Sequence, residues 1–238
     1  MALFWWRSHS LVMRSTLDKP MNETVDLVGE YRQFRIGLVR NKSIERKEST
    51  FVPSNDPALV ALLKKKKFKQ SFIDVIMQVN NCKFKWADPT DTNICGLAEI
   101  MDIESIVNCT CEEDVDEEEE GVAPLDKFHL VDMVRPDRAV GIFSGKHAGD
   151  SLYMYSMNGV PQYLGLNMEG YVKMLIATRG FDHWQGALWQ HHHKDRSFDS
   201  LGRMKEHLPR LFPEVKVEEL LALYDSLRIS EKMPPGTE

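Results

Sequence analysis

The chain has 238 residues, of which 42% are hydrophobic and 28% are charged, an ordinary balance for a globular protein with one sizeable core. Four cysteines are too few for a disulfide scaffold at this length, and no apolar run approaches the roughly 20 residues of a membrane-spanning helix. The composition therefore argues against disulfide-stapled and membrane-embedded classes. It predicts a cytoplasmic single domain with no membrane partner.

The net charge of −6 is concentrated in one acidic run. Removing the eight acids of residues 112–120 from this charge leaves the other residues with +2. Such a run is usually a solvated segment, and its functional alternative is the attraction of a basic partner. Because the acids would repel phosphates, nucleic acid is not a predicted partner. The acids are Glu112, Glu113, Asp114, Asp116, Glu117, Glu118, Glu119 and Glu120.

The sequence divides into a core and two extensions. Residues 1–50 have weak periodicity, so we predict a partly ordered N-terminal extension. Residues 51–195 carry the clear helical and strand patterns of the core, and residues 196–238 are predicted to form a C-terminal helical extension. In the first extension a helical stripe is indicated only at Val25, Val28, Tyr31 and Phe34.

Two helices are predicted at the start of the core. Asp56 can cap the first, with Pro57 at its first position, and the four lysines of residues 64–67 are interpreted as its solvated end. Ser71 precedes the second, whose apolar residues recur at the spacing of a core-facing stripe. Asn80 and Asn81 are expected to end it.

Strand patterns begin at residue 82. Residues 82–86 and 96–100 are candidate strands separated by turn-forming residues. Beyond the acidic run, residues 139–144, 151–156 and 161–166 predict three more strands, with Asn158 and Gly159 in a type I′ hairpin turn. Strands in this order form a meander, so the sequence predicts an antiparallel sheet with helices packed on one face.

The last part of the chain is predicted to be helical. Asn167 can cap a helix that Gly180 ends in the left-handed conformation, and Asp182 can cap the next helix. A final helical stripe runs from Val217 to Leu227. The predicted class is therefore α+β, with helices, an antiparallel sheet and further helices in that order.

Motifs of the common enzyme classes do not occur in the sequence, which has no phosphate-binding loop, nucleophile elbow or zinc-protease signature. The spacing of Cys82, Cys95, Cys109 and Cys111 differs from that of a zinc knuckle. Three consecutive histidines, residues 191–193, point in different directions on a helix and suit a helix C-terminus better than one shared ion. We therefore predict no metal, no cofactor and no catalytic residues.

Three stretches of the chain carry a family pattern. The first runs through the helix of residues 72–81 to Trp86, then to a strand with an early glycine, Gly96, and the short acidic segment 102–106. The second joins residues 142–144 and 152–155 around Gly149 and Asp150, and the third is residues 171–184. Their order resembles the SUKH superfamily of Smi/Knr-type cell-wall regulators and bacterial immunity proteins. The resemblance covers about residues 55–190, with Asn81 or Cys82 where that family usually has glycine.

This resemblance implies a SUKH-like fold and a non-catalytic, protein-binding function. The first hypothesis is an immunity protein that neutralises a cognate toxin, a basic nuclease or deaminase domain, by stoichiometric binding. The alternatives are a regulatory scaffold of the cell-wall type and an unrecognised small hydrolase or deaminase. The predicted binding residues are the acids of the run and the sheet edge within residues 139–166. Tyr153, Tyr155 and Tyr163 are its candidate anchors, or else pack beneath the C-terminal helices.

Overall fold

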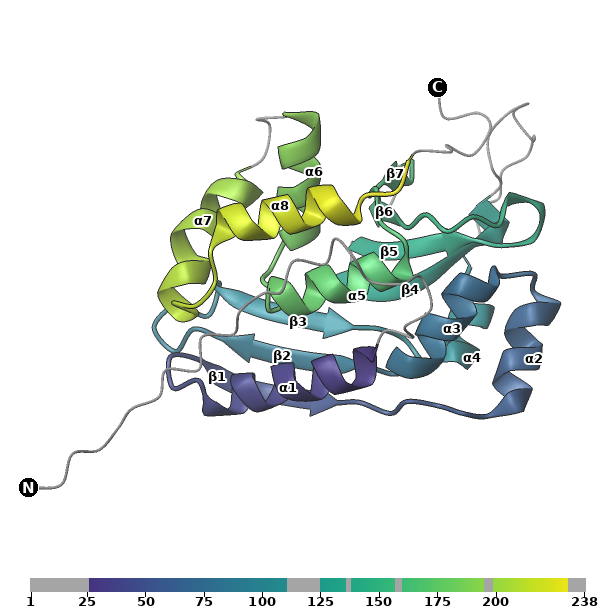
Figure 1. Cartoon of the computed structure of the whole chain (residues 1–238), viewed down its shortest axis with the longest axis horizontal. Helices are drawn as coiled ribbons and strands as arrows, with labels where there is room; N and C mark the ends of the chain where they lie inside the picture. The colour runs from purple at the N-terminus through teal and green to yellow at the C-terminus, as the bar shows by residue number, and fades with distance from the viewer. Residues whose placement is uncertain (1–25, 111–124, 136–137, 157–159, 195–198, 231–238) are drawn as a thin grey trace, which may run out of the picture.

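The computed structural model describes residues 26–110, 125–135, 138–156, 160–194 and 199–230. Within these ranges the chain forms eight α-helices and two antiparallel sheets, one of three strands and one of four (Figure 1). The predicted α+β class is confirmed. Two sheets stand where the sequence predicted one, because the strands before and after the acidic run pair separately.

The first sheet has the order β1-β2-β3 and comprises β1 (Glu45–Thr50), β2 (Lys83–Ala87) and β3 (Cys95–Glu99). The predicted strands 82–86 and 96–100 are thus confirmed to within one residue, whereas β1 was not predicted. Phe84 and Trp86 point into the core, and Lys85 between them is exposed, as the twofold repeat of a strand requires.

The second sheet has the order β4-β5-β6-β7 and comprises β4 (Phe128–Arg135), β5 (Arg138–Phe143), β6 (Tyr153–Ser156) and β7 (Gln162–Tyr163). The three strands predicted in residues 139–166 correspond to β5, β6 and β7. The turn predicted at Asn158 and Gly159 lies outside the described residues. Strand β4 was missed by the sequence analysis, and it positions much of the candidate site.

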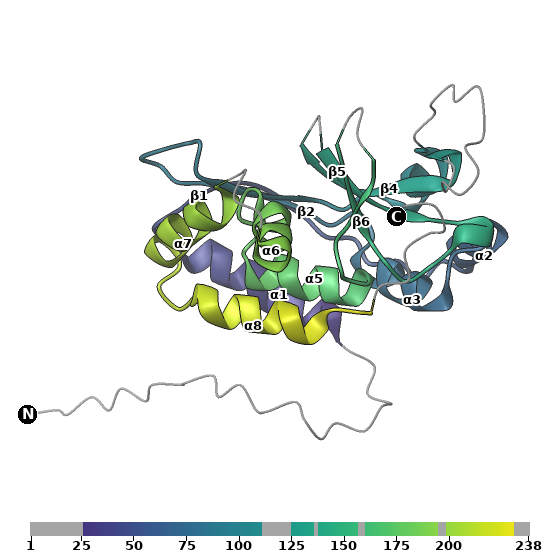
Figure 2. The same cartoon turned by 90° about the horizontal axis from the view of Figure 1, so that it is seen from above.

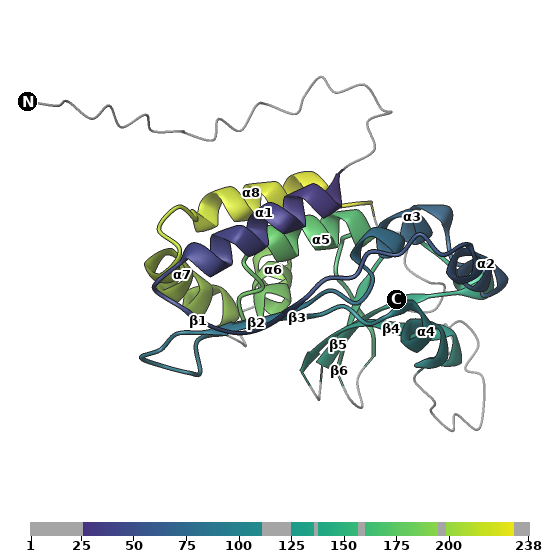
Figure 3. The same ribbon diagram turned by 90° about the horizontal axis from the view of Figure 1, so that it is seen from below.

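The helices lie around these sheets in two groups. In Figures 2 and 3, α1, α5 and α8 lie on the same side of β1–β3, and α6 and α7 continue this layer. Helices α2, α3 and α4 gather at the other end of the molecule (Figure 3). The bounds are α1 (Leu27–Arg40), α2 (Pro57–Lys65), α3 (Gln70–Val79), α4 (Ile103–Asn108), α5 (Met168–Ala177), α6 (Trp184–His193), α7 (Ser200–Leu211) and α8 (Val217–Leu227).

Several helix boundaries follow from local chemistry. The Asp56 side chain accepts a hydrogen bond from the Ala58 N–H (2.8 Å), and the Asn167 side chain accepts one from the Gly170 N–H (2.8 Å), so both predicted caps are confirmed. The prediction that Asp182 caps α6 is wrong. His183 occupies that position, because the Asp182 carboxylate is bound by an arginine of β4.

One hydrophobic core joins residues from α1 through α8. Trp86 is fully buried in it, and its indole N–H donates to the Arg179 carbonyl at 2.7 Å. Gly96 leaves the space for this ring, because a Cβ at position 96 would lie 2.2 Å from the indole. Among the described helices, none is both long and apolar enough to cross a bilayer.

Candidate functional site

The candidate site lies where the two sheets separate. Ile100, just after β3, forms an antiparallel bridge with Asp132 of β4. Gly96, near the start of β3, instead bridges Phe181 in the connection between α5 and α6. The edge of β3 is therefore shared between a strand of the second sheet and a segment that precedes α6.

Backbone hydrogen bonds fix this segment against β3. The Leu97 N–H donates to the Gly180 carbonyl at 2.8 Å, and the Asp182 N–H donates to the Cys95 carbonyl at 2.8 Å. Residues 180–182 thus behave as a short extra strand. They position the side chains of the α5–α6 connection beside the end of β4.

The α5–α6 connection contains three residues in the left-handed region. Their φ angles are 58° at Arg179, 59° at Gly180 and 62° at His183. At position 180 a Cβ would lie 2.5 Å from the Phe84 ring, so this position requires glycine. A left-handed conformation at a residue other than glycine costs about 1 kcal/mol, and such strain is often found at functional sites.

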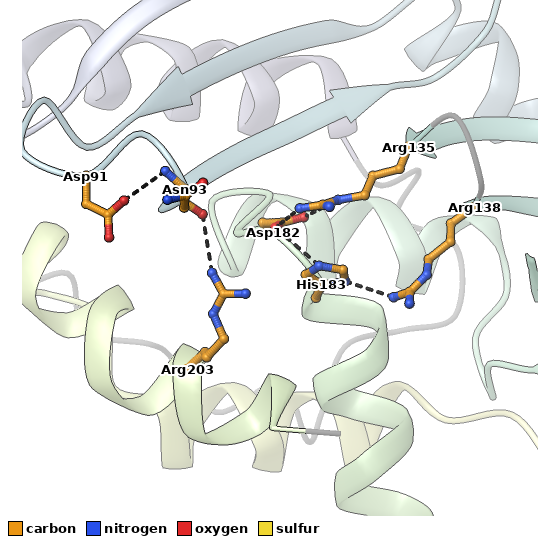
Figure 4. Close-up of polar contacts among 7 residues, drawn as sticks. All are labelled: Asp91, Asn93, Arg135, Arg138, Asp182, His183 and Arg203. Carbon is orange, nitrogen blue, oxygen red and sulfur yellow. Dashed lines mark hydrogen bonds and ion pairs between the residues drawn. The ribbon is translucent and has the colours of Figure 1, made fainter. Parts of the chain in front are cut away.

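Arg135 and Arg138 contact two side chains of this turn, those of Asp182 and His183, as Figure 4 shows. Arg135, at the end of β4, forks onto Asp182: its Nε lies 3.1 Å from Oδ1, and its Nη2 is paired with Oδ2. Arg138, at the start of β5, places Nη1 2.9 Å from His183 Nδ1. The Asp182 side chain is buried, while 41% of the Arg135 side chain is exposed. The turn therefore offers guanidinium groups to solvent.

The protonation state of His183 follows from its surroundings. Burial lowers the pKa of His183, the Asp182 carboxylate opposes this shift, and the guanidinium groups of Arg135, Arg138 and Arg203 reinforce it. The ring is therefore neutral at pH 7. With its proton on Nε2 both contacts are satisfied, because Nδ1 then accepts from Arg138 and Nε2 donates toward Asp182 Oδ2, 3.4 Å away.

A third arginine approaches from α7. Arg203 donates from Nη2 to the Asn93 carbonyl at 3.3 Å, and the Asn93 N–H donates to the Asp91 carboxylate at 3.0 Å. This contact joins α7 to the loop between β2 and β3. The three guanidinium groups of the site thus come from strands β4 and β5 and from helix α7 (Figure 4).

A groove of about 260 Å³ adjoins this cluster. One wall is formed by strands β5–β7, and the other by α6 and the first residue of α7. A Cβ at Gly186 would lie 3.2 Å from Ser200 Oγ, so the glycine allows α6 and α7 to approach closely here. The lining residues are Arg138, Met154, Ser156, Gln162, Gly186, Trp189, Gln190 and Ser200.

A second cavity of about 220 Å³ lies beside α3 and α5 and is acidic. Asp74, Asp150 and Glu169 line it. Asp150 accepts a hydrogen bond from the Ser71 hydroxyl, and Glu169 is paired with Lys173 at 2.5 Å. Within the part of the chain that the structure describes, no cluster of histidine, cysteine and carboxylate side chains could hold a metal ion.

The interior contains a separate polar network. Asp132 accepts from the Glu99 N–H at 2.9 Å and from the Tyr171 hydroxyl at 2.6 Å, and Gln185 donates to the same hydroxyl oxygen at 2.9 Å. Burial raises the pKa of Asp132 to about 6, although the hydrogen bonds from Tyr171 and Glu99 lower it. This carboxylate connects β4 to β3, α5 and α6.

Other buried titratable groups also hold the fold together. His129 of β4 places Nδ1 2.9 Å from the Ile106 carbonyl and Nε2 2.9 Å from Ser144 Oγ, and burial lowers its pKa. Burial raises the pKa of Cys82 to about 12, so its thiol stays protonated at neutral pH.

The three tyrosines predicted as anchors come together in one aromatic cluster. Tyr153, Tyr155 and Tyr163 pack with Phe128 and Phe143, and all five are buried. The cluster lies on the face of β4–β7 opposite the main core, and the Tyr163 hydroxyl donates to the Ile229 carbonyl at 2.8 Å. The rings contact one another, and their role toward a partner stays a prediction.

The acidic run, residues 112–120, lies outside the described residues, so its binding role also stays a prediction. The sequence analysis overlooked Arg135, Arg138, Asp182, His183 and Arg203 as site residues. One signal was available: two arginines flank Pro136 and Asp137, a turn-forming pair that indicates a hairpin end. The partner of Arg135 could not be identified in this way, because Asp182 is 47 positions away.

Comparison with protein-family models, with curated proteins and with solved structures gave no match.

Proposed function

We propose that the chain is a non-catalytic, protein-binding domain of the SUKH type. In this proposal it is a single domain that acts in the cytoplasm as an immunity protein and neutralises a cognate toxin by stoichiometric binding. The order of its helices and strands supports the SUKH assignment, together with the helix layer on one side of β1–β3. Cys82, Cys95 and Cys109 are free thiols, as expected in a reducing compartment.

The main support for the proposal is the location of two kinds of polar group. Titratable groups with shifted pKa values lie within the fold, whereas the polar groups of the groove lie at the surface. Asp132 and His129 have shifted pKa values, but both are buried and hydrogen-bonded within the fold, and His183, whose pKa burial also lowers, is held between Arg138 and Asp182. The polar groups at the surface groove are a guanidinium, two carboxamides and two hydroxyls, from Arg138, Gln162, Gln190, Ser156 and Ser200. These are groups that recognise a partner, whereas catalysis needs titratable groups that reach the substrate.

The test requires a basic toxin domain encoded next to the gene for this chain. The purified chain is titrated against that domain while toxin activity is measured, and the mass of the mixture is determined by light scattering. We expect a one-to-one complex and full inhibition at one equivalent. Inhibition that grows with time at a small fraction of an equivalent would show turnover and contradict the proposal. Lack of a complex would contradict it as well.

A further inference from the structure

Five lysines surround the corner between α2 and α3. All five are exposed, and they are Lys64, Lys65, Lys66, Lys67 and Lys69. Within the described ranges of the chain, none of them forms an ion pair or a side-chain hydrogen bond. The sequence has no acid between Asp56, at the start of α2, and Asp74 in α3. The five charges are therefore available to a ligand.

The backbone holds these lysines on a fixed corner. The Phe68 N–H donates to the Leu63 carbonyl at 3.2 Å, and the Lys67 N–H donates to the Lys64 carbonyl at 2.9 Å. These two bonds form the helix-ending motif in which glycine usually takes the left-handed position. Lys67 occupies that position here, with a φ of 62°. The Phe68 side chain is buried and stacks on Phe72, with ring centroids 5.1 Å apart, so the corner is anchored to the core.

The helix that leads to the lysines has an apolar outer side. Residues 57–63 of α2 are all apolar, yet only Leu63 among them is buried. Ala58 and Ala61 are exposed, and they share one face of the helix with Lys65 at the spacing i, i+3 and i+7. Helix α2 lies at one end of the molecule, packed on α3 and α4 (Figures 1 and 3). An apolar helix face beside a lysine cluster is the pattern of a peripheral membrane-binding surface.

A lipid surface fits these features better than a nucleic acid does. Lysine carries a compact charge without the planar fork by which arginine recognises phosphates and bases. Phe68 is the only aromatic residue between positions 57 and 71, and it is buried, so bases have no ring to stack on here. Headgroups and acyl chains together use both parts of the surface, the lysines and the apolar face of α2.

We propose that the corner of residues 64–69 and the exposed face of α2 bind the surface of a membrane that contains anionic phospholipids. The lysines contact the headgroups, and Ala58 and Ala61 lie against the apolar part of the interface. The net charge of −6 does not prevent this contact, because charges are screened beyond about 8 Å at physiological ionic strength. The inference goes beyond the proposed function, and it replaces the sequence-based interpretation of the lysines as a solvated helix end with no membrane partner.

The test measures sedimentation of the full chain with vesicles of phosphatidylcholine alone or of phosphatidylcholine mixed with phosphatidylserine. We expect the mixed vesicles to bind at least about tenfold more tightly, since each lysine near an anionic surface contributes about fivefold. The difference should shrink at about 1 M salt, where charges are screened beyond about 3 Å. Equal binding to the two kinds of vesicle, or no binding to the mixed vesicles, would overturn the inference.

Variants locate the binding. Lys67→Gly removes one charge where glycine suits the backbone, so binding to the mixed vesicles should weaken about fivefold while the free energy of unfolding stays the same or rises. Lys194→Gly is the matched control, because Lys194 is also exposed and left-handed, with a φ of 54°, but lies at the end of α6, away from α2 (Figures 1 and 2). It should change binding less than about twofold. Equal effects of the two glycine substitutions would contradict the site.

A further variant tests the apolar part of the surface. Ala61→Glu places an acid at an exposed position of α2, so binding to the mixed vesicles should weaken at least about fivefold without loss of the fold. Unchanged binding would show that α2 does not face the membrane and would contradict the proposed surface.

Other occupants give distinct results. A duplex oligonucleotide that binds the chain more tightly than the mixed vesicles do, and displaces it from them, would overturn the lipid chemistry. An acidic peptide with the same effect would overturn it as well. If the toxin complex forms but the mixed vesicles do not bind, this inference fails and the proposed function stands. If the vesicles bind but the toxin is not inhibited, the proposed function fails and this inference stands.

Discussion

Two polar clusters connect β4 to the α5–α6 region, and they differ mainly in their access to water. The inner cluster joins Asp132 to Tyr171 and Gln185, all buried. The outer cluster, only three residues further along β4, joins Arg135 to Asp182 and leaves much of the guanidinium exposed. Strand β4 and the α5–α6 region together therefore provide both a rigid anchor and a surface for recognition.

The largest predicted effect concerns the charge of the inner cluster. Asp132 ionises near 3.8 in an unfolded chain and near pH 6 in the fold. Between these values the unfolded state loses its proton first, so the free energy of unfolding falls as pH rises from about 3 to about 7 and levels off above. Relative to Asp132→Asn, the wild type should lose about 3 kcal/mol over this range. Urea denaturation at several pH values measures the difference, and parallel curves would show that Asp132 does not titrate.

The second prediction removes one hydroxyl from the inner cluster. Tyr171→Phe removes the donor to Asp132 Oδ2 and the acceptor of the Gln185 amide, and leaves Asp132 with the Glu99 N–H, so the free energy of unfolding should fall by about 2 kcal/mol. The change is measured by urea denaturation at pH 7. A loss below about 0.5 kcal/mol would mean that the network contributes little.

The third prediction concerns the outer cluster. Arg135→Gln should cost about 1 kcal/mol, because the pair is half-exposed but its carboxylate is buried. Arg138→Gln, which removes a donor to a neutral histidine, should cost less and serves as the matched control. If Arg135→Gln destabilises the fold as much as Tyr171→Phe does, the distinction between anchor and recognition surface is wrong.

The smallest stability effect is predicted for the acidic run. Replacing Glu117, Glu118, Glu119 and Glu120 with glutamine should change the free energy of unfolding by less than about 0.5 kcal/mol, as is usual for surface charges. The on-rate for a basic toxin should fall several-fold at low salt and approach that of the wild type at 1 M, where charges are screened beyond about 3 Å. Stopped-flow measurements at both salt concentrations decide this, and an unchanged on-rate would locate binding elsewhere.

The parts of the fold that follow from local chemistry were predictable. Asp56 and Asn167 cap helices because their carboxylate and carboxamide oxygens reach N–H groups two or three residues away. Strand β4 was not predictable in this way. Its polar residue Asp132 is buried in mid-strand, and two register shifts against β5 interrupt the alternation that marks a strand.

Most of the candidate site could not be predicted from the sequence, for a related reason. Asp182 follows a helix stop and precedes a helix, the usual place of a cap, but β3 holds its backbone where Arg135 can reach the carboxylate. A long-range contact therefore overrides a local preference. The groove also depends on a long-range contact. Gly186 allows α6 to approach Ser200 of α7, and the sequence does not show that these two residues are neighbours.

The bridge from Gly96 to Phe181 also affects how the chain is made. On the ribosome, β3 emerges well before residues 180–182, the segment that later pairs with part of its edge. At ~5–20 residues per second, the interval is on the order of ten seconds. During this time the unpaired edge of β3 could bind other nascent chains, so the protein should depend on chaperones that shield hydrophobic strands until α6 has been synthesised.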